Sequence, residues 1–325
     1  MFKIQSNIQV GAKFKFEVFN ATGLQTKASA EFGNLVLDAG LNRMGKGSYF
    51  DAVAVGTGNS VPSAGQTALD NQVAYSNQEQ GNFSISYQAE PVPCYVLQRR
   101  YRFNAGTFSG QNLAEVSMGW VTGSTFNAFN RALIKDSQGQ PTTMTLLSDE
   151  YLDVICLLHY YPDITDKNQL VGLVDGNNNL IAETQITTRP ALLGAFNPPG
   201  QYASSWPPPY IFNVVDALVS QNNWMKLLTG DMGTITGEPT GTVLASTSYG
   251  SSDPVQLVKD EYVDGSYKRS GKFIIKLNTG NGTIKSMLLK TTLGCYQAQF
   301  TPPIVKNNTQ VLTIPIELSW GRKEV

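Results

Sequence analysis

Charged residues are scarce in this sequence. Only 15% of its 325 residues are Asp, Glu, Lys or Arg, against roughly 25% in typical soluble domains, and the formal net charge is −1. We therefore expect neither a basic nucleic-acid-binding surface nor a polybasic membrane tether. Because 41% of the residues are hydrophobic, disorder driven by charge repulsion is not expected either. A nearly neutral surface is weakly protected against association, which favours assembly.

Histidine and cysteine are equally rare. The single histidine, His159, would have to serve any Ser–His or Cys–His pair, and one chain cannot form a multi-histidine metal site. It lies in an alternating run, residues 157–161, which predicts a half-buried strand position. Cys94, Cys156 and Cys295 are far apart and form no CxxC pair, so we expect buried free thiols and no structural zinc. The sequence predicts no metal, no cofactor and no enzyme activity.

Long apolar runs are also missing. No stretch approaches the roughly 18 apolar residues that a membrane-spanning helix needs, so we expect no membrane association. Residues 1–10 lack an apolar core behind a basic cluster, which predicts no signal peptide. Together with the expected free thiols, this predicts synthesis in a reducing cytoplasm.

Strand patterns dominate the chain. Residues 12–19 alternate in polarity and, with residues 24–32 after a turn, predict a hairpin. Helical spacing is limited to residues 34–44, with Asn34 as a possible N-cap, and to residues 213–218. The 30 glycines and 16 prolines supply turns between short strands.

The two halves of the chain share an order of features. Both contain an aromatic-led apolar strand, a glycine-containing turn and a polar loop with Pro and Gly, followed by further strands. The matched segments are 50–67 with 224–242, 95–104 with 267–278, 108–120 with 282–289, and 142–160 with 308–320. We therefore predict a mainly β protein of two tandem, duplicated antiparallel β-sandwich domains, 1–165 and 166–325, joined near 162–167 and each with one short helix.

Two groups of residues have the composition of chemical sites, but each has a simpler interpretation. Residues 56–59, Gly-Thr-Gly-Asn, superficially resemble a phosphate-binding loop, but without a following Lys-Ser/Thr a tight turn is favoured. Carboxylates cluster in two similar motifs, DEYLD and DEYVD, which would suit a cation or acid/base chemistry, although an accidental likeness is the favoured interpretation. These carboxylates are Asp149, Glu150, Asp153, Asp260, Glu261 and Asp264.

Arginines and aromatic residues are the candidate interface residues. Arg100 and Arg102 lie on one face of a predicted strand, opposite Tyr101 and Phe103, which indicates either a solvated sheet face or a contact between subunits. The segment 196–211 combines five prolines with aromatic residues and predicts an extended arm. Such an arm either docks on a neighbour, clamps a ligand, or covers the edge of its own domain. Its candidate contact residues are Tyr202, Trp206 and Tyr210.

One passage resembles a known class of proteins. Residues 34–74 contain the helix-like DAGLNRM, the strand FDAVAV, the turn GTGNSVP and then T-x-L. This passage resembles a segment that recurs in tail, fibre and collar proteins of tailed bacteriophages, and residues 266–322 are similar to the ends of such proteins. The resemblance implies a virion protein of mainly β structure that works in several copies. It provides no active-site residues, and the lack of shaft repeats favours a compact collar, neck or tail-attached module over a whole fibre.

The expected function follows from the low charge, the duplication and this resemblance. We expect a non-enzymatic structural component of a tailed-phage virion, made in the host cytoplasm and assembled with copies of itself and other tail or neck proteins. An alternative is a receptor-binding tail fibre or spike module that recognises a host glycan or protein, with Tyr202 and Trp206 stacking on sugars. A third is a polysaccharide-degrading enzyme that uses Asp149 and Asp153.

Overall fold

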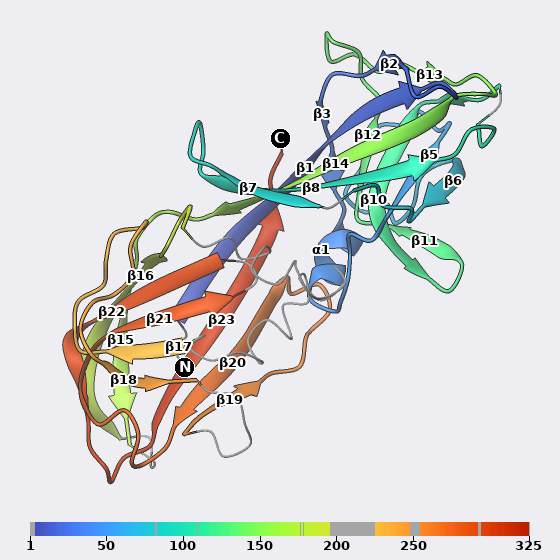
Figure 1. Cartoon of the computed structure of the whole chain (residues 1–325). Coiled ribbons are helices and arrows are strands. Elements are labelled where there is room, and N and C mark those ends of the chain that lie inside the picture. Colours follow the sequence, from blue (N-terminus) through green and yellow to red (C-terminus); the bar gives the residue numbers. More distant parts are fainter. Residues whose placement is uncertain are drawn as a thin grey trace. The chain divides into compact units, whose positions relative to one another are not determined.

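A computed structural model describes residues 4–81, 83–108, 110–175, 177, 179–195, 225–247, 254–291 and 294–324. Within these residues the chain is mainly β, with 23 strands and a single helix, which confirms the predicted class (Figure 1). The predicted helix at 213–218 lies outside the described residues. No helix in the described part of the chain is long and apolar enough to cross a membrane.

The chain divides into two compact units, each interrupted in sequence. The first unit contains described residues 9–161 and 321–324, and the second contains 4–8, 162–195 and the described residues between 225 and 320. Three strands, β1, β14 and β23, run across the sequence boundaries between the units. The predicted domain ranges, 1–165 and 166–325, stay a prediction.

Two main antiparallel sheets form the first unit (Figure 1). In one, β7, β8 and β14 pair in that order beside β1, which also pairs with β2 and β3; the other has the order β4-β12-β10-β5-β6, and β11 pairs with β10. A two-stranded sheet joins β13 to β9. The bounds are β1 (Ile4–Phe19), β2 (Gln25–Ala28), β3 (Phe32–Gly33), β4 (Leu35–Val36), β5 (Ala52–Gly56), β6 (Gln72–Ser76), β7 (Ser84–Gln88), β8 (Cys94–Phe103), β9 (Asn112–Leu113), β10 (Glu115–Thr122), β11 (Thr125–Ala128), β12 (Asn130–Leu133), β13 (Met144–Thr145) and β14 (Tyr151–Pro162).

The core of the first unit follows the alternation of its strands. Phe14 and Phe16 of β1 are fully buried and contact Phe32, with ring centroids 6.0 and 5.7 Å from it. Tyr49 and Tyr160 are also buried, and their hydroxyl groups lie 2.8 Å apart. The predicted hairpin after residue 19 is present, because β2 pairs with the second half of β1.

The one described helix, α1 (Asp38–Met44), begins later than the sequence predicts. Residues 35–36 stay extended because they pair with β12. Leu37 is the N-cap and has no side-chain capping bond, so the prediction of Asn34 as the cap is wrong. The helix buries Leu41 and Met44, the positions that its spacing indicated.

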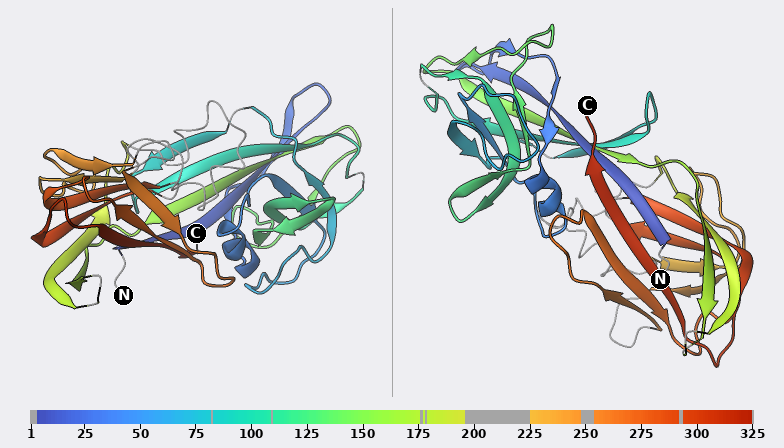
Figure 2. Two further views of the ribbon diagram at one scale, coloured as in Figure 1. Left: turned by 90° about the horizontal axis from the view of Figure 1, so that it is seen from below. Right: turned by 180° about the vertical axis from the view of Figure 1, so that it is seen from behind.

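The second unit also contains two antiparallel sheets (Figure 1, Figure 2). One has the order β19-β20-β23 followed by the start of β1, and the other has the order β15-β16-β22-β21-β17-β18. Alternating apolar residues of β23, among them Ile314, Ile316 and Leu318, are buried as the sequence indicates. The bounds are β15 (Lys167–Val174), β16 (Leu180–Pro190), β17 (Met225–Leu228), β18 (Val243–Ser246), β19 (Val255–Lys259), β20 (Lys268–Ile275), β21 (Gly282–Thr291), β22 (Gly294–Lys306) and β23 (Leu312–Arg322).

Candidate functional site

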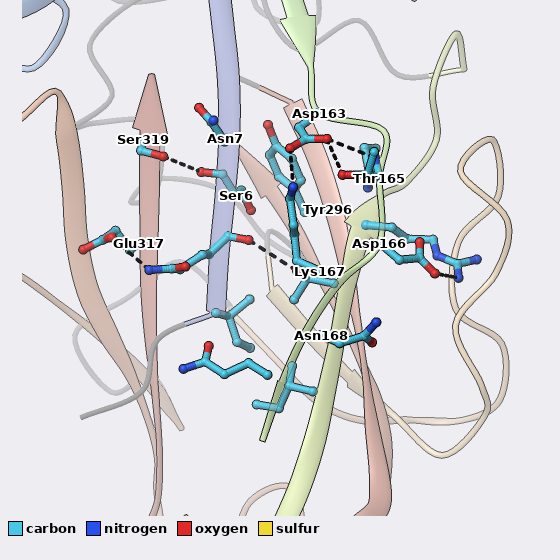
Figure 3. A pocket seen from close by; sticks show the side chains of 17 residues that line it. Ser6, Asn7, Asp163, Thr165, Asp166, Lys167, Asn168, Tyr296, Glu317 and Ser319 are labelled. Atoms are coloured by element: carbon cyan, nitrogen blue, oxygen red, sulfur yellow. Dashed lines mark hydrogen bonds and ion pairs between the residues drawn. The ribbon is translucent and has the colours of Figure 1, made fainter. Parts of the chain in front are cut away.

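A polar cleft of about 490 Å³ opens in the second unit (Figure 3). It is bordered by the start of β1, the turn after β14, the strands β15 and β16, and the end of β23. Amides, hydroxyls and carboxylates dominate its lining, with Ile4 and Ile186 as apolar members. The polar lining residues include Gln5, Ser6, Asn7, Asp163, Thr165, Asp166, Lys167, Asn168, Gln169, Thr188, Arg189, Glu317 and Ser319.

The charged groups at one side of the cleft are paired with each other. The Asp163 carboxylate lies 2.8 Å from Lys167 Nζ and accepts hydrogen bonds from the backbone and hydroxyl of Thr165. Burial opposes ionisation of Asp163, but the bonds from Lys167 and Thr165 outweigh it and lower its pKa. Asp166 forms an ion pair with Arg189. This side is therefore an internally neutralised surface.

The opposite side of the cleft is built from the ends of the chain. Gln5 donates to Glu317 at 3.3 Å, and the hydroxyl of Ser319 donates to the carbonyl of Ser6 at 3.3 Å (Figure 3). Thr188 donates to the carbonyl of Gln5. A lining in which amides and hydroxyls stand beside internally paired charges suits a hydroxyl-rich ligand better than a strongly charged one. The described residues contain no group of three or more His, Cys, Asp or Glu that could hold a metal ion.

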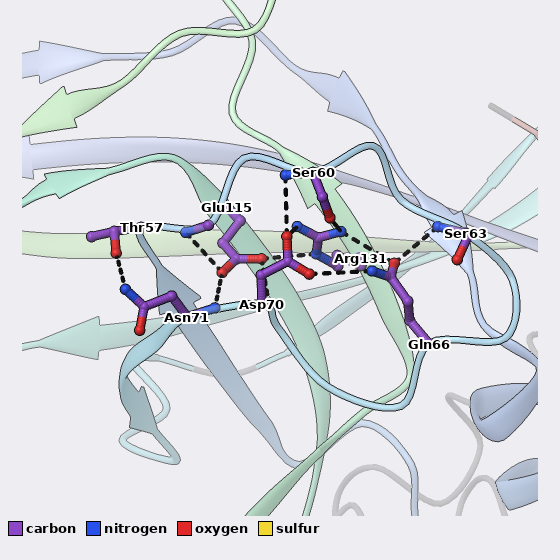
Figure 4. Close-up of polar contacts among 9 residues, drawn as sticks. Thr57, Ser60, Ser63, Gln66, Asp70, Asn71, Glu115 and Arg131 are labelled. Carbon is purple, nitrogen blue, oxygen red and sulfur yellow. Dashed lines mark hydrogen bonds and ion pairs between the residues drawn. The ribbon is translucent and has the colours of Figure 1, made fainter.

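A buried carboxylate organises the loop between β5 and β6 in the first unit (Figure 4). Glu115 of β10 is fully buried. Its Oε1 accepts from the backbone N–H of Gly58 at 3.0 Å and of Asn71 at 2.8 Å, and its Oε2 accepts from that of Asp70 at 3.1 Å. Hydrogen bonds to the charged form of a carboxylate are about twice as strong as neutral ones. One side chain thus joins both ends of the loop.

Arg131 of β12 neutralises Glu115 from inside the unit. Its Nε lies 2.8 Å from Glu115 Oε2, and one terminal nitrogen lies 2.7 Å from the Asp70 carboxylate. The other terminal nitrogen donates to the hydroxyl of Ser60 and the amide oxygen of Gln66. Arg131 is fully buried, so its planar fork of donors is satisfied within the protein.

The glycines of this loop are explained by the same carboxylate. A Cβ atom at Gly56 would lie 2.6 Å from Glu115 Oε1, and one at Gly58 would lie 2.5 Å from it. The loop therefore presents a backbone N–H to an anion, but that anion is the protein's own Glu115. The predicted tight turn at residues 56–59 is wrong, because Gly56 ends β5 and residues 57–59 begin the long loop that leads to β6 at Gln72.

In the second unit, the side-chain amide of Gln297 occupies the strand position that corresponds to Arg131 in the first unit. Ser286 of β21 pairs with Leu228, the last residue of β17, and with Gln299 of β22. Gln297, two residues before Gln299, is buried and donates to the carbonyls of Gly233 and Thr234 in the loop between β17 and β18. In the first unit, Glu115 pairs in the same way with the last residue of β5 and with Leu133, and Arg131 stands two residues before Leu133.

The predicted interface arginines are engaged within the chain. Arg102 makes two hydrogen bonds to the buried Asp153, at 2.7 and 2.8 Å, and its guanidinium lies 4.2 Å from the ring centroid of Tyr151. Arg100 bridges Asp153, at 3.1 Å, and Glu17, at 2.8 Å. An interface role for Arg100 and Arg102 stays a prediction, while Tyr202, Trp206 and Tyr210 lie outside the described residues.

The DEYLD carboxylates have different surroundings. Asp153 pairs with the arginines, whereas Glu150 is buried and accepts from the backbone of Leu147, the hydroxyl of Thr26 and the ammonium of Lys27. Burial of Glu150 opposes its ionisation, but these bonds outweigh it and lower its pKa to about 2. Asp149 is exposed. The side chains therefore do not converge on one reaction centre.

His159 lies next to Cys94, so these two residues are the Cys–His pair that the sequence neither predicted nor excluded. Cys94 Sγ lies 3.9 Å from His159 Nδ1, and both residues are buried. Burial raises the pKa of Cys94 and lowers that of His159 to about 4, so the pair is an uncharged thiol and imidazole. A reactive cysteine needs the opposite shift. All three cysteines are free and buried, as predicted.

Sequence reasoning missed the Glu115–Arg131 pair. Each is the only charged residue of a short strand, and its neighbours in that strand are buried. That placement was the available signal, because charged residues are almost never fully buried unless they are paired. Comparison with protein-family models, curated proteins and solved structures finds no match for this chain.

Replacing Arg131 with Ala should lower the free energy of unfolding by about 3–5 kcal/mol, because Glu115 would keep a buried, uncompensated charge. Urea unfolding followed by circular dichroism measures this. The exposed pair of Lys285 and Asp231 provides the control, since Lys285→Ala should cost about 1 kcal/mol or less. A loss below about 1 kcal/mol for Arg131→Ala would contradict the role assigned to this pair.

Replacing Glu150 with Gln should change how stability depends on pH. The folded pKa of Glu150, about 2, lies below its ordinary value of 4.5, so its contribution is fully present above pH 4.5 and is lost as the pH falls toward 2. The wild type should therefore exceed Glu150→Gln in stability at neutral pH, and the gap should close in acid. Thermal melts across this pH range test it, with the exposed Asp149→Asn as control. A gap independent of pH would refute the assignment.

Proposed function

We propose that this protein is a non-enzymatic structural component of a tailed-phage virion, assembled in several copies at the tail or the head–tail neck. The observation that carries the proposal is an apolar surface on the β15–β16 hairpin. Leu170, Val174, Leu180 and Ile181 are 67, 52, 62 and 63% exposed. These four exposed apolar residues lie on one hairpin, and exposed apolar patches mark interaction sites. The resemblance of residues 34–74 to phage tail, fibre and collar proteins supports the virion setting.

We also propose that the two units are duplicated β-sandwich domains. Support comes from strand pairing: β7-β8-β14 and β6-β5-β10-β12 in the first unit have the same sequence order and pairing as β19-β20-β23 and β18-β17-β21-β22 in the second. These strands lie in or next to the segments that the sequence matches. The equivalent positions of Arg131 and Gln297 support the same conclusion. Repeated building blocks suit a protein that forms part of a larger assembly.

A second candidate function is recognition of a host-surface glycan or protein, as in a receptor-binding tail fibre or spike module. The polar cleft of Figure 3 favours it, because its neutral amides and hydroxyls match the hydrogen-bonding groups of sugars. A glycan array measures such binding. Gln169→Trp, in the cleft, should abolish it, and the control Gln25→Trp, in the first unit, should leave it intact. Absence of binding to any glycan or host cell would remove it.

The structural proposal predicts that the purified chain forms a defined oligomer and that the protein is present in intact particles. Analytical ultracentrifugation measures the first, and immunoblotting of density-purified particles of the encoding phage measures the second. Immunogold labelling should then mark the tail or neck. A chain that stays monomeric at all concentrations and is absent from purified particles would overturn the proposal.

A further inference from the structure

Strand β15 is an open edge. It is the terminal strand of its sheet, and within the described part of the chain its strand partner is β16. Native proteins usually protect such edges with charges, proline or bulges. β15 contains no proline, and Lys167, its first residue, is its only charged residue. The irregularity in its pairing with β16 lies at its last step, between Leu173 and Val174.

One face of β15 carries apolar residues, although their partners across to β16 include Gln185, opposite Leu170, and Glu183, opposite Gly172. Leu170, Gly172 and Val174 share a face, because side chains alternate along a strand. Leu180 of β16 covers Gly172: its Cδ1 lies 2.7 Å from the position that a Cβ of Gly172 would occupy. Leu170 and Leu180 are both more than three-fifths exposed. Among the residues that the structure describes, the outer edge of β15 therefore has no strand partner and carries an apolar strip.

The sequence of β15 is complementary to itself. When two copies of residues 167–175 are placed antiparallel with Val171 opposite Val171, residue 168 faces residue 174 and residue 170 faces residue 172. In this register Lys167 of each copy faces Asp175 of the other, on the same face of the extended sheet. The side chain of Lys167 is 57% exposed and also contacts Asp163 of its own chain at 2.8 Å, so Asp175 of the second copy would be a further partner of its ammonium group. Hydrogen bonds from Asn179 and Asn177 lower the pKa of Asp175, so its carboxylate is charged at neutral pH.

We propose that two copies of this chain pair through β15, antiparallel about a twofold axis at Val171, and so extend the sheet across the subunit boundary. Leu170 of each copy then lies over Gly172 of the other, next to its Leu180, and buries the apolar strip. Opposite charges fix the register at both ends, and a twofold contact uses the same surface on both partners. This inference rests on the proposed assembly in several copies and identifies β15 as the surface through which two copies meet.

These observations favour a second copy of this chain as the partner that pairs with β15. An uncharged strand flanked by Lys167 at one end and Asp175 at the other offers no net charge to an acidic or a basic partner. It matches an antiparallel copy of itself at every charged position. Pairing through strand edges also supplies main-chain hydrogen bonds without any further specialised residue.

Disulfide cross-linking tests the register. Mixing Asn168→Cys with Val174→Cys chains should give a disulfide-linked dimer under mild oxidation, because these positions face each other. Either variant alone should give none, since equal positions are then six residues, or about 20 Å, apart. The native cysteines are buried, so their background is low. Equal cross-linking in single variants, or none in the mixture, would overturn the proposed pairing.

A charge on the apolar strip tests the contact. Leu170→Lys should weaken self-association in analytical ultracentrifugation by about tenfold or more, because each dimer would place two charges against apolar surface. Val305→Lys is the matched control, since Val305 is 70% exposed on β22 and belongs to neither strand of the hairpin. Circular dichroism melts verify that both variants fold.

The outcomes separate the two proposals. Wild-type chain that associates and is unaffected by Leu170→Lys overturns pairing through β15 and leaves the virion role standing. Wild-type chain that stays monomeric and is absent from purified particles overturns both. Association lost in Leu170→Lys and kept in Val305→Lys, together with cross-linking only in the mixture, supports the inference.

Discussion

The buried pairing of Glu115 with Arg131 is the constraint around which the first unit is arranged. Both side chains are fully buried, and burying an ion is costly unless its partner and hydrogen bonds replace water. The loop between β5 and β6 must therefore bring its amide groups and Asp70 to fixed places. Glycine is needed at positions 56 and 58 because the backbone approaches the carboxylate so closely. The path of this loop and the glycines at positions 56 and 58 are thus tied to one interaction.

The second unit solves the same problem without charge. Gln297 and Gln299 accept backbone N–H groups of the loop after β17, and Gln297 also donates to its carbonyls. An amide supplies donors and acceptors at a lower desolvation cost than an ion pair. This choice is consistent with the low charge of the whole sequence. In both units the buried polar side chains hold loops in place.

Much of the candidate site was beyond the reach of sequence patterns. The order of apolar and polar residues predicted that Arg100 and Arg102 share a face, and they do so, but their common partner Asp153 comes from a strand 50 residues away. Pattern reasoning grouped Asp153 with Glu150 because they are neighbours in sequence. Strand alternation and cross-strand pairing separate them: one contacts two arginines and the other contacts Lys27. Sequence proximity says little about which charges meet in a sheet.

The sequence by itself determined the mainly β class, the buried free thiols and the buried phase of the strands, because alternation and side-chain polarity act locally. It did not determine where the helix begins, since pairing of residues 35–36 with β12 keeps them extended. Only the tertiary structure decided that residues 4–8 and 321–324 contribute to different units from most of their neighbours, and that Glu115 meets Arg131. These features depend on contacts between residues far apart in the chain, and the local pattern does not say which residues meet.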